Sequence, residues 1–105
     1  MFIRQAFFDG VIKAGQEEQF HAYVDAQLLP LWRAFPGVVR VELFRNVVSP
    51  ENAQTFPLHT LFEYPDRATM EAALASPVRQ RVVELFPGLL AMFDGRVYHV
   101  NSERG

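Results

Sequence analysis

Cysteine is absent from the 105 residues of this chain. Its absence excludes disulfide bonds, a nucleophilic thiol and thiolate metal ligands, and it is typical of a reducing compartment. Long apolar runs are absent too, since no stretch approaches the roughly 18 residues of a membrane-spanning helix. An acidic residue, Asp9, stands where a signal peptide would have its apolar segment. We therefore expect a soluble, cytoplasmic protein.

An excess of either charge is also missing. The net charge is −2, and acidic and basic residues are interspersed without a basic stripe, so nucleic acid and anionic membranes are not expected as partners. No glycine-rich phosphate loop occurs, and the few serines lie at turns or caps. The three histidines are scattered, without an acidic cluster beside them. We therefore expect neither a metal site nor a cofactor.

Apolar residues, by contrast, are plentiful: they make up half of the chain, and ten of them are phenylalanine. The length suits a single domain over residues 1–105, and the composition is too apolar for a disordered chain. A monomer of this size has difficulty covering so much aromatic surface. We therefore expect an interface shared between two copies of the chain.

The apolar pattern predicts six elements in the order strand, helix, strand, strand, helix, strand. The predicted strands cover residues 2–11, 38–48, 58–64 and 96–101. The first predicted helix begins at Gln16, and its apolar stripe runs through Phe20, Val24, Leu28, Leu31 and Phe35. Pro30 lies inside this stripe and cannot donate a helical hydrogen bond, so we expect a break or kink there.

The second helical region starts with two capping patterns. Asp66 fits an N-cap, and Ser76 before Pro77 fits a fresh cap with proline at the first helical position. Its second segment carries apolar residues at helical spacing, at Val78, Val82, Leu85 or Phe86, and Leu89. Four segments are expected to be irregular: a long connection at 49–57, a disturbed helix end at Pro87-Gly88, a turn at Asp94-Gly95 and a loose tail at 102–105.

This order of elements predicts a ferredoxin-like α+β fold, β-α-β-β-α-β, with a four-stranded antiparallel sheet and both helices on one face. The open face is expected to be mixed rather than polar, with Phe44 beside Arg40, and Phe62 beside Thr60 and Tyr64. Such a face is too apolar for water. Two sheets should therefore pack face to face, which makes a homodimer, a dimeric α+β barrel.

Short motifs also follow one another at fixed spacing. In the first half they are Gly15, Glu18-Gln19-Phe20, Tyr23, Leu28-Leu29-Pro30-Leu31 and Pro36-Gly37. In the second half they are Tyr64-Pro65-Asp66, Met70, Ala73, Leu74, Ser76-Pro77 and Phe93-Asp94-Gly95. In order and spacing, over essentially the whole chain, these motifs resemble the EthD-like family of the dimeric α+β barrel superfamily.

The resemblance implies a pocket between the helices and the sheet for a small, mostly apolar or aromatic molecule. It also implies chemistry without a cofactor, in a catabolic or polyketide-like pathway. The family usually has a histidine where this chain has Leu28. Leucine has no proton to give, so the acid–base role proposed for that histidine is not transferred. Related barrels that open haem use a histidine on the second helix, and residues 67–93 contain none, which argues against haem.

His59 and Glu63 are the first candidates for acid–base chemistry. They lie four residues apart on the third predicted strand, so both point to the same face, about 13 Å apart at about 3.3 Å per residue. Histidine changes charge near neutral pH, and a partly buried glutamate can have a raised pKa, so both could flank one ligand as base and acid. The alternative is a structural pair at the dimer interface.

Four further side chains are candidates for ligand contacts. Tyr23 matches a family position and Leu28 replaces the family histidine, while Trp32 follows the proline in the first helix. Tyr23 could equally be core padding, and Trp32 either a lid or a core or interface residue. Tyr98 and His99 are adjacent on the last strand and face opposite ways, so at most one of them can point into a helix-side pocket.

Three functions remain open from the sequence. The first is a small cofactor-free enzyme or its accessory, and the second is a non-catalytic ligand-binding or structural homodimer. The third is a cofactor-free monooxygenase of the antibiotic-biosynthesis type. A cavity of a few hundred Å³ between helices and sheet, reached by His59 or Glu63, would support chemistry, and a filled interior would exclude it.

Overall fold

The structure, a computed structural model, describes residues 1–105. One antiparallel sheet joins four strands, β1 (Phe2–Ile12), β2 (Arg40–Ser49), β3 (Gln54–Tyr64) and β4 (Phe93–Glu103), in the order β2-β3-β1-β4. The helical segments are α1 (Glu17–Tyr23), the π-helix η1 (Val24–Leu28), α2 (Leu29–Arg33), α3 (Arg67–Leu74) and α4 (Pro77–Leu90). The predicted ferredoxin-like α+β fold is confirmed.

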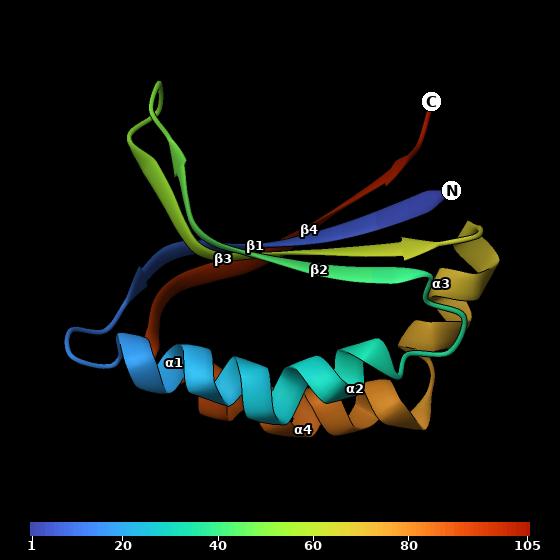
Figure 1. Ribbon diagram of the computed structural model, residues 1–105, viewed down its shortest axis with the longest axis horizontal. Helices are drawn as coiled ribbons and strands as arrows, with labels where there is room; N and C mark the ends of the chain where they lie inside the picture. The colour runs from blue at the N-terminus through green and yellow to red at the C-terminus, as the bar shows by residue number, and fades with distance from the viewer.

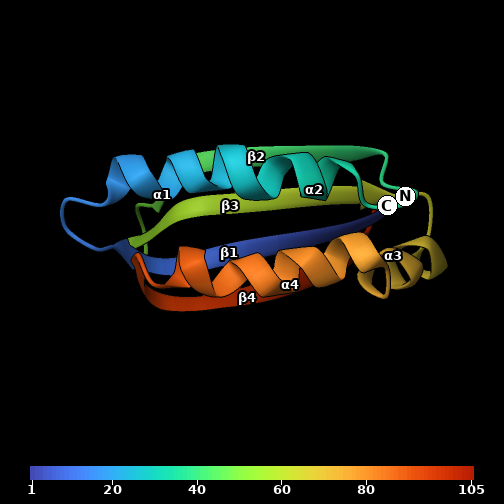
Figure 2. The same ribbon diagram turned by 90° about the horizontal axis from the view of Figure 1, so that it is seen from below.

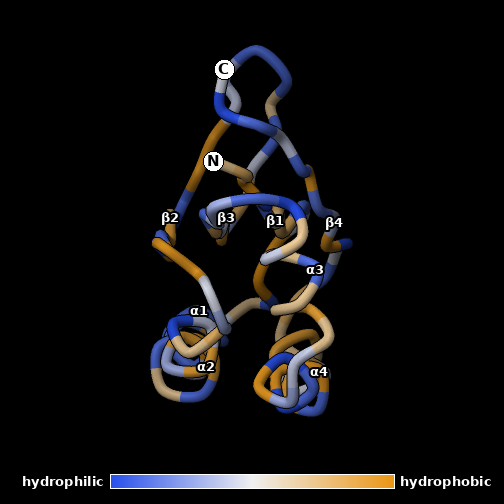
Figure 3. The backbone as a smooth tube through the Cα atoms, turned by 90° about the vertical axis from the view of Figure 1, so that its right-hand side faces the viewer, coloured by the Kyte–Doolittle hydropathy of each residue, from blue (hydrophilic) through white to orange (hydrophobic).

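The segments α1, α2 and α4 lie on one face of the sheet, α3 lies at one end of it, and the other face is open (Figure 1). The segments α1, η1 and α2 follow one another as a single rod beneath β2 and β3, whereas α4 lies beneath β1 and β4 (Figure 2). Seen from one end, the two rods run next to each other below the sheet (Figure 3). The space that matters for function is therefore bounded by the sheet above and by two helical rods below.

The antiparallel register decides which side chains face the helices. Thr60 pairs with Ala6, and Ala6 pairs with His99, so these residues form one row across β3, β1 and β4. Ala6 is the central residue of this row, so only its methyl group points toward the helices there. The neighbouring Phe8 is buried in the core, which shows that the even-numbered residues of β1 point toward the helices.

The side assigned to three residues of β3 needs correction. Phe62, Thr60 and Tyr64 were expected on the open face, but they are buried on the helix side of the sheet. His59 and Glu63 therefore occupy the open face instead. Alternation predicts which residues share a face, but both faces of β3 carry bulky residues, so the pattern does not say which face is covered.

The helical rod continues through Pro30 without a break, but the α-helix is interrupted directly before it by the π-helix η1, close to where a break or kink was predicted. In η1 the helix widens, and the backbone N–H of Leu29 donates to the carbonyl of Val24, five residues earlier. Pro30 follows in the first turn of α2. Its missing backbone N–H therefore lies directly after the widened turn, where the regular hydrogen-bond pattern is already interrupted. The extra residue also rotates the buried stripe, so that Trp32 rather than Leu31 is buried.

Both predicted caps are present in the second helical region. The Asp66 carboxylate accepts a hydrogen bond from the backbone N–H of Thr69 at 2.8 Å. The Ser76 hydroxyl accepts one from the backbone N–H of Arg79 at 3.2 Å. These two caps separate α3 from α4 at the place where the sequence indicated a fresh start.

The end of α4 is not disturbed by Pro87 and Gly88, contrary to expectation, since the helix continues to Leu90. A Cβ added to Gly88 would lie 2.5 Å from the hydroxyl oxygen of Tyr23. Glycine therefore lets Tyr23 of α1 lie directly on α4. This packing contact outweighs the poor helix propensity of the two residues.

Strands β1 and β4 also extend through residues predicted as turns. Gly10 pairs with Gly95 inside the sheet, so Asp94-Gly95 belongs to a strand and not to a turn. A Cβ on either glycine would lie 2.2 Å from a carbonyl oxygen of the facing strand. The two glycines thus permit a close approach of the strands that other residues would prevent.

Two other segments that were predicted to be irregular are more ordered than expected. Ser49 pairs with Gln54, so a tight turn replaces the long connection expected between β2 and β3. The tail is ordered against the first strand, because the backbone N–H of Arg104 donates to the carbonyl of Met1 at 3.0 Å. Pairing with a neighbouring strand, which single-residue propensities do not encode, explains both corrections.

Candidate functional site

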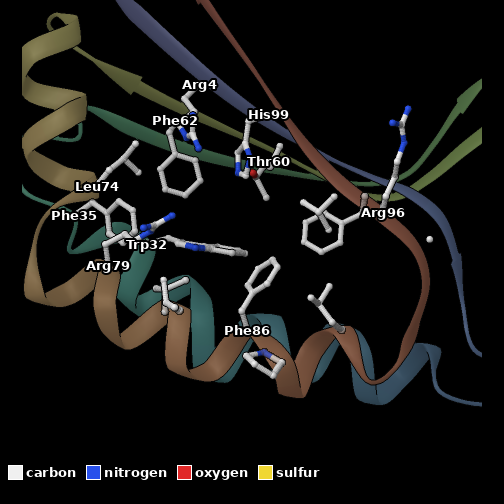
Figure 4. A pocket seen from close by; sticks show the side chains of 18 of the residues that line it. Arg4, Trp32, Phe35, Thr60, Phe62, Leu74, Arg79, Phe86, Arg96 and His99 are labelled. Atoms are coloured by element: carbon white, nitrogen blue, oxygen red, sulfur yellow. The ribbon is translucent and has the colours of Figure 1, made fainter.

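A cavity of about 640 Å³ lies between the sheet and the helices. It is within the range typical of pockets for small organic ligands. Most of its 19 lining residues are hydrophobic, and they come from three strands and from α2, α3 and α4. The apolar wall includes Phe8, Trp32, Phe62, Val82, Phe86 and Leu90. Trp32, Phe62 and Phe86 are labelled in Figure 4.

The cavity exists because the helix-facing side of the sheet has small residues at its centre. Ala6 and Thr60 are paired neighbours on β1 and β3, and both line the cavity. Phe8 and Phe62, one pleat away on the same strands, reach much farther toward the helices and form part of the wall. The interior is therefore not filled, so the first part of the condition set above is met, but neither His59 nor Glu63 lines the cavity as the second part required.

Three basic side chains line one part of this mostly apolar pocket, and a fourth, Arg96 of β4, also lines it but pairs with Asp9 at 3.5 Å. Arg4 of β1 and His99 of β4 reach it from the sheet, and Arg79 reaches it from the first turn of α4 (Figure 4). No aspartate or glutamate is among the lining residues. The pocket therefore has a basic region without an acidic counterpart.

The two arginines have no ionic partner within the chain. Neither Arg4 nor Arg79 takes part in an ion pair. Arg4 donates to the neutral side-chain oxygen of Asn101 at 3.1 Å. Burial and the nearby Arg79 charge lower the pKa of Arg4. The two guanidinium groups are thus close enough to repel each other.

The same environment keeps His99 neutral. Burial lowers the pKa of His99 to about 4, and the charges of Arg4 and Arg79 act in the same direction. His99 as a whole is an exposed residue, so its surroundings are mixed rather than dry. At neutral pH this residue can donate one hydrogen bond and accept another, but it adds no charge.

Tyr64 brings a buried hydroxyl to the pocket lining. Its side chain is fully buried, and the hydroxyl has no hydrogen-bond partner. Burial raises the pKa of Tyr64 to about 12, although the Arg4 charge opposes this shift. The hydroxyl therefore stays protonated. A buried polar group without a partner is rare in folded proteins and costs free energy.

The two residues first considered for acid–base chemistry lie outside this pocket. The ring of His59 stacks on Phe7 at 4.3 Å between centroids, and its Nε2 lies 2.8 Å from the side-chain oxygen of Gln5. Burial lowers the pKa of His59. All of these contacts are on the open face, so His59 does not reach the cavity between sheet and helices.

Glu63 is held by two arginines on the same open face. Its carboxylate oxygens lie 3.1 Å from an Nη atom of Arg40 and 2.9 Å from an Nη atom of Arg104. Only 7% of the residue is exposed. Glu63 is thus a buried carboxylate that is paired with two arginines of the same chain. The structure does not join Glu63 and His59 in one site.

Of the four residues considered for ligand contacts, only Trp32 lines the cavity. The hydroxyl of Tyr23 donates to the backbone carbonyl of Leu85 at 2.6 Å, which ties α1 to α4. Leu28 is fully buried in the core. Tyr98 lies on the open face, where its ring stacks near Phe7 at 5.4 Å.

Sequence reasoning missed Arg4, Arg79 and His99 as a group. Two of them were accessible from alternation, since Arg4 has the parity of the buried Phe8, and pairing across β1 and β4 places His99 on the same side. Arg79 carries a weaker indication. It is a basic residue in the first turn of a helix, where the helix dipole disfavours positive charge.

No protein-family model matches the sequence, and no curated protein matches it. The fold, however, matches solved structures over nearly the whole chain. One is an ethyl tert-butyl ether D (EthD) family protein from Bacillus halodurans, with a TM-score of 0.73, 16% identity and 100% of both chains covered. Another is a dimeric ferredoxin-like protein of unknown function from Jannaschia sp., with a TM-score of 0.69, 18% identity and 98% of both chains covered.

The chain thus shares the fold of this EthD family protein and of this dimeric ferredoxin-like protein. The resemblance predicted from the motifs is therefore confirmed at the level of fold. A third match is a variant of SnoaB, a cofactor-independent oxygenase from Streptomyces nogalater, with a TM-score of 0.62 and 18% identity, covering 98% of this chain and 90% of that one. At these identities the likeness concerns the EthD-like architecture and not the activity.

No three histidine, aspartate or glutamate side chains come together in an arrangement that could hold a metal ion. None of the helices is long and apolar enough to cross a membrane.

Proposed function

We propose that this protein binds or transforms a small apolar or aromatic metabolite in the pocket between the helices and the sheet. The reaction would need no cofactor. The observation that carries the proposal is the cavity of about 640 Å³ with an apolar wall and a basic region. A space of this size with a mostly apolar lining and a few polar groups is typical of sites for small organic ligands.

Cofactor-free oxygenation is the second candidate, and the two arginines favour it. In such a reaction the substrate, as an enolate or phenolate, gives electrons to O₂. One oxygen atom enters the product and the other leaves as water with two substrate hydrogens. Arg4 and Arg79 would stabilise the substrate anion, since fixed positive charges in an apolar pocket favour the formation of negative charge.

We propose further that the open sheet face pairs with a second copy of the chain. This face carries Phe44, which is 40% exposed, next to His59, with ring centroids 5.3 Å apart. Phe7 and Tyr98 extend the same aromatic surface. His59 and Glu63 then belong to the interface, which was the alternative to a catalytic role, and their acid–base function stays an untested prediction.

A thermal-shift screen with small aromatic compounds and lactones tests the binding function. A ligand at a hundredfold excess over its Kd stabilises the folded state by about 2.7 kcal/mol. For a domain of this size that raises the melting temperature by roughly 10 °C. Ala6→Leu fills the centre of the pocket and should abolish the shift, whereas Ala22→Leu on the exposed side of α1 should preserve it.

Two results would contradict the proposal. One is that no compound of the screen changes the melting temperature. The other is a shift of equal size in Ala6→Leu and in the unsubstituted protein, because the ligand would then bind elsewhere. The melting temperatures of both variants without ligand show whether each is folded.

A further inference from the structure

The basic region of the pocket is electrostatically unfavourable when it stands alone. Arg4 and Arg79 both line the cavity, neither has an ionic partner, and no acidic residue lines it. The chain as a whole carries a net charge of −2, so this concentration of positive charge is local. Uncompensated and partly buried charges destabilise a fold unless a ligand meets them.

The position of Arg79 adds to this cost. Arg79 lies in the first turn of α4, where the aligned peptide dipoles favour negative rather than positive charge. Arg81, two residues farther along, pairs with Glu84 at 3.3 Å and points away from the pocket. Arg79 has no such partner within the chain. The fold therefore tolerates a locally unfavourable charge at the pocket wall.

A buried hydrogen-bonding group without a partner lies in the same region. The hydroxyl of Tyr64 has no partner although Tyr64 is fully buried, and Tyr64 and Arg4 both line the cavity. The Arg4 charge acts on the pKa of Tyr64. The pocket lining thus holds an unsatisfied hydroxyl as well as unpaired cations.

From this arrangement we infer that the pocket selects a carboxylate-bearing ligand, whose carboxylate is held by Arg4 and Arg79 and whose aromatic or apolar body lies against the apolar wall. The inference rests on the proposed function and specifies its ligand class. A guanidinium group matches a carboxylate with two parallel hydrogen bonds. Trp32, Phe62 and Phe86 provide the surface for the rest of the molecule.

The neutral state of His99 fits a ligand with a single charge. Its imidazole can donate a hydrogen bond to a carboxylate or a carbonyl oxygen without adding a third positive charge. Arg96, the third arginine of the lining, lies 3.5 Å from a carboxylate oxygen of Asp9, which leaves Arg4 and Arg79 as the unpaired cations. Two unpaired cations against a mostly apolar lining suit one carboxylate on an apolar body better than a phosphate ester, which needs more donors.

The test compares 2-naphthoate with the neutral 2-naphthamide by isothermal titration calorimetry. The two probes share the same ring and differ in the charge. For the unsubstituted protein we expect naphthoate to bind at least tenfold more tightly than naphthamide. Arg79→Gln and, independently, Arg4→Gln should each weaken naphthoate binding tenfold to a hundredfold, on the order expected for a charge-assisted hydrogen bond, and leave naphthamide binding within about twofold.

Arg81→Gln is the matched control, because it removes the same charge from the same helix outside the pocket. It should leave the affinities of both probes within about twofold. Circular dichroism establishes that each variant is folded. A second arginine variant keeps the test decisive if one of the two substitutions disturbs the fold.

The outcomes separate the inference from the proposed function. Equal binding of both probes, blocked by Ala6→Leu, overturns the carboxylate site and leaves the small-molecule pocket intact. A preference for naphthoate that survives in both arginine variants also overturns the inference. Failure of both probes to bind contradicts the carboxylate site, whereas the proposed function would fail only if the broader thermal-shift screen were blank as well.

Discussion

At the scale of single residues, a few side chains give an apolar pocket its chemical character. Ala6 leaves space at the centre of the sheet, and Arg4, Arg79 and His99 make one part of that space basic. The family motif, by contrast, draws attention to Leu28, which is fully buried and carries no polar group. The polar groups available to a ligand therefore lie on the sheet and on α4, not at the position of the family histidine.

We predict that His99 stays neutral throughout the physiological pH range. Burial and the charges of Arg4 and Arg79 lower its pKa to about 4, so its imidazole proton signals in an NMR titration should have a midpoint near pH 4. A midpoint near the ordinary value of about 6.5 would contradict the placement of this side chain beside two arginines.

The lowered pKa also has a consequence for stability. Between about pH 6.5 and pH 4 the unfolded chain binds a proton at His99 and the folded chain does not. The free energy of unfolding should therefore decrease as the pH falls through this window. His99→Gln should reduce this decrease in urea unfolding at pH 7 and pH 5. The pKa values of His21 and His59 are also lowered, so the variant should keep part of the pH dependence. A variant with an unchanged pH dependence would contradict this account.

At the scale of secondary-structure elements, the contact between the two helical rods fixes the lower wall of the pocket. Tyr23 of α1 lies against Gly88 and donates to the carbonyl of Leu85, both on α4. The π-helix η1 then brings Trp32 of α2 into the buried stripe and into the pocket wall. The spacing of the two rods, and with it the width of the pocket, depends on these contacts.

We predict that Gly88→Ala destabilises the protein although alanine is the better helix former by about 1 kcal/mol. The new Cβ would lie 2.5 Å from the Tyr23 hydroxyl oxygen and 2.9 Å from the ring carbon that bears it. Urea unfolding should show a loss of about 1–3 kcal/mol, the usual cost of overpacking. In a double-mutant cycle, Tyr23→Ala should relieve much of this loss. If the two effects add independently, the two helices are not in the contact described.

How far the sequence predicts these elements depends on whether local or long-range contacts decide them. The caps at Asp66 and Ser76 are local, and both were predicted correctly. The continuity of α4 through Gly88 and the strand pairing of Gly10 with Gly95 depend on partners far away in the sequence. Neither feature can be predicted from residue propensities or from the periodicity of apolar residues.

The same reason limits the prediction of the site. Alternation groups Arg4 with Phe8 and places His59 with Glu63, but the face that the helices cover is a property of the assembled sheet. Arg79 comes from an element about 75 residues away from Arg4, and nothing in the spacing connects the two. The architecture follows from the sequence pattern, whereas the basic region follows only from the packing of α4 on the sheet.

At the scale of the whole molecule, the sheet separates the pocket from the exposed aromatic surface. Its helix side holds the pocket, and its open face carries the aromatic surface for which we propose a second copy of the chain as partner. The Jannaschia protein with the same fold is described as dimeric. The charged residues of the open face, Glu63 with Arg40 and Arg104, are paired within one chain and therefore bring no unpaired charge to such an interface.

Sedimentation equilibrium at micromolar concentration tests the dimer. The chain has a mass of 12.0 kDa, and we predict a particle of twice that mass. Phe44→Glu places a charge in the aromatic surface and should shift the equilibrium to the monomer, whereas Ala22→Glu on the far side of α1 should not. A monomeric unsubstituted protein would contradict the proposed interface, and the binding of small ligands would then need no partner.

The binding of a small acidic aromatic molecule between helices and sheet is the central claim, and NMR chemical-shift mapping with 2-naphthoate tests it most directly. We predict that the largest changes fall on the backbone amides of Ala6, Thr60, Arg79 and His99, which line the pocket. Changes confined to His59, Leu61 and Phe44 on the open face, or no changes at all, would contradict the account.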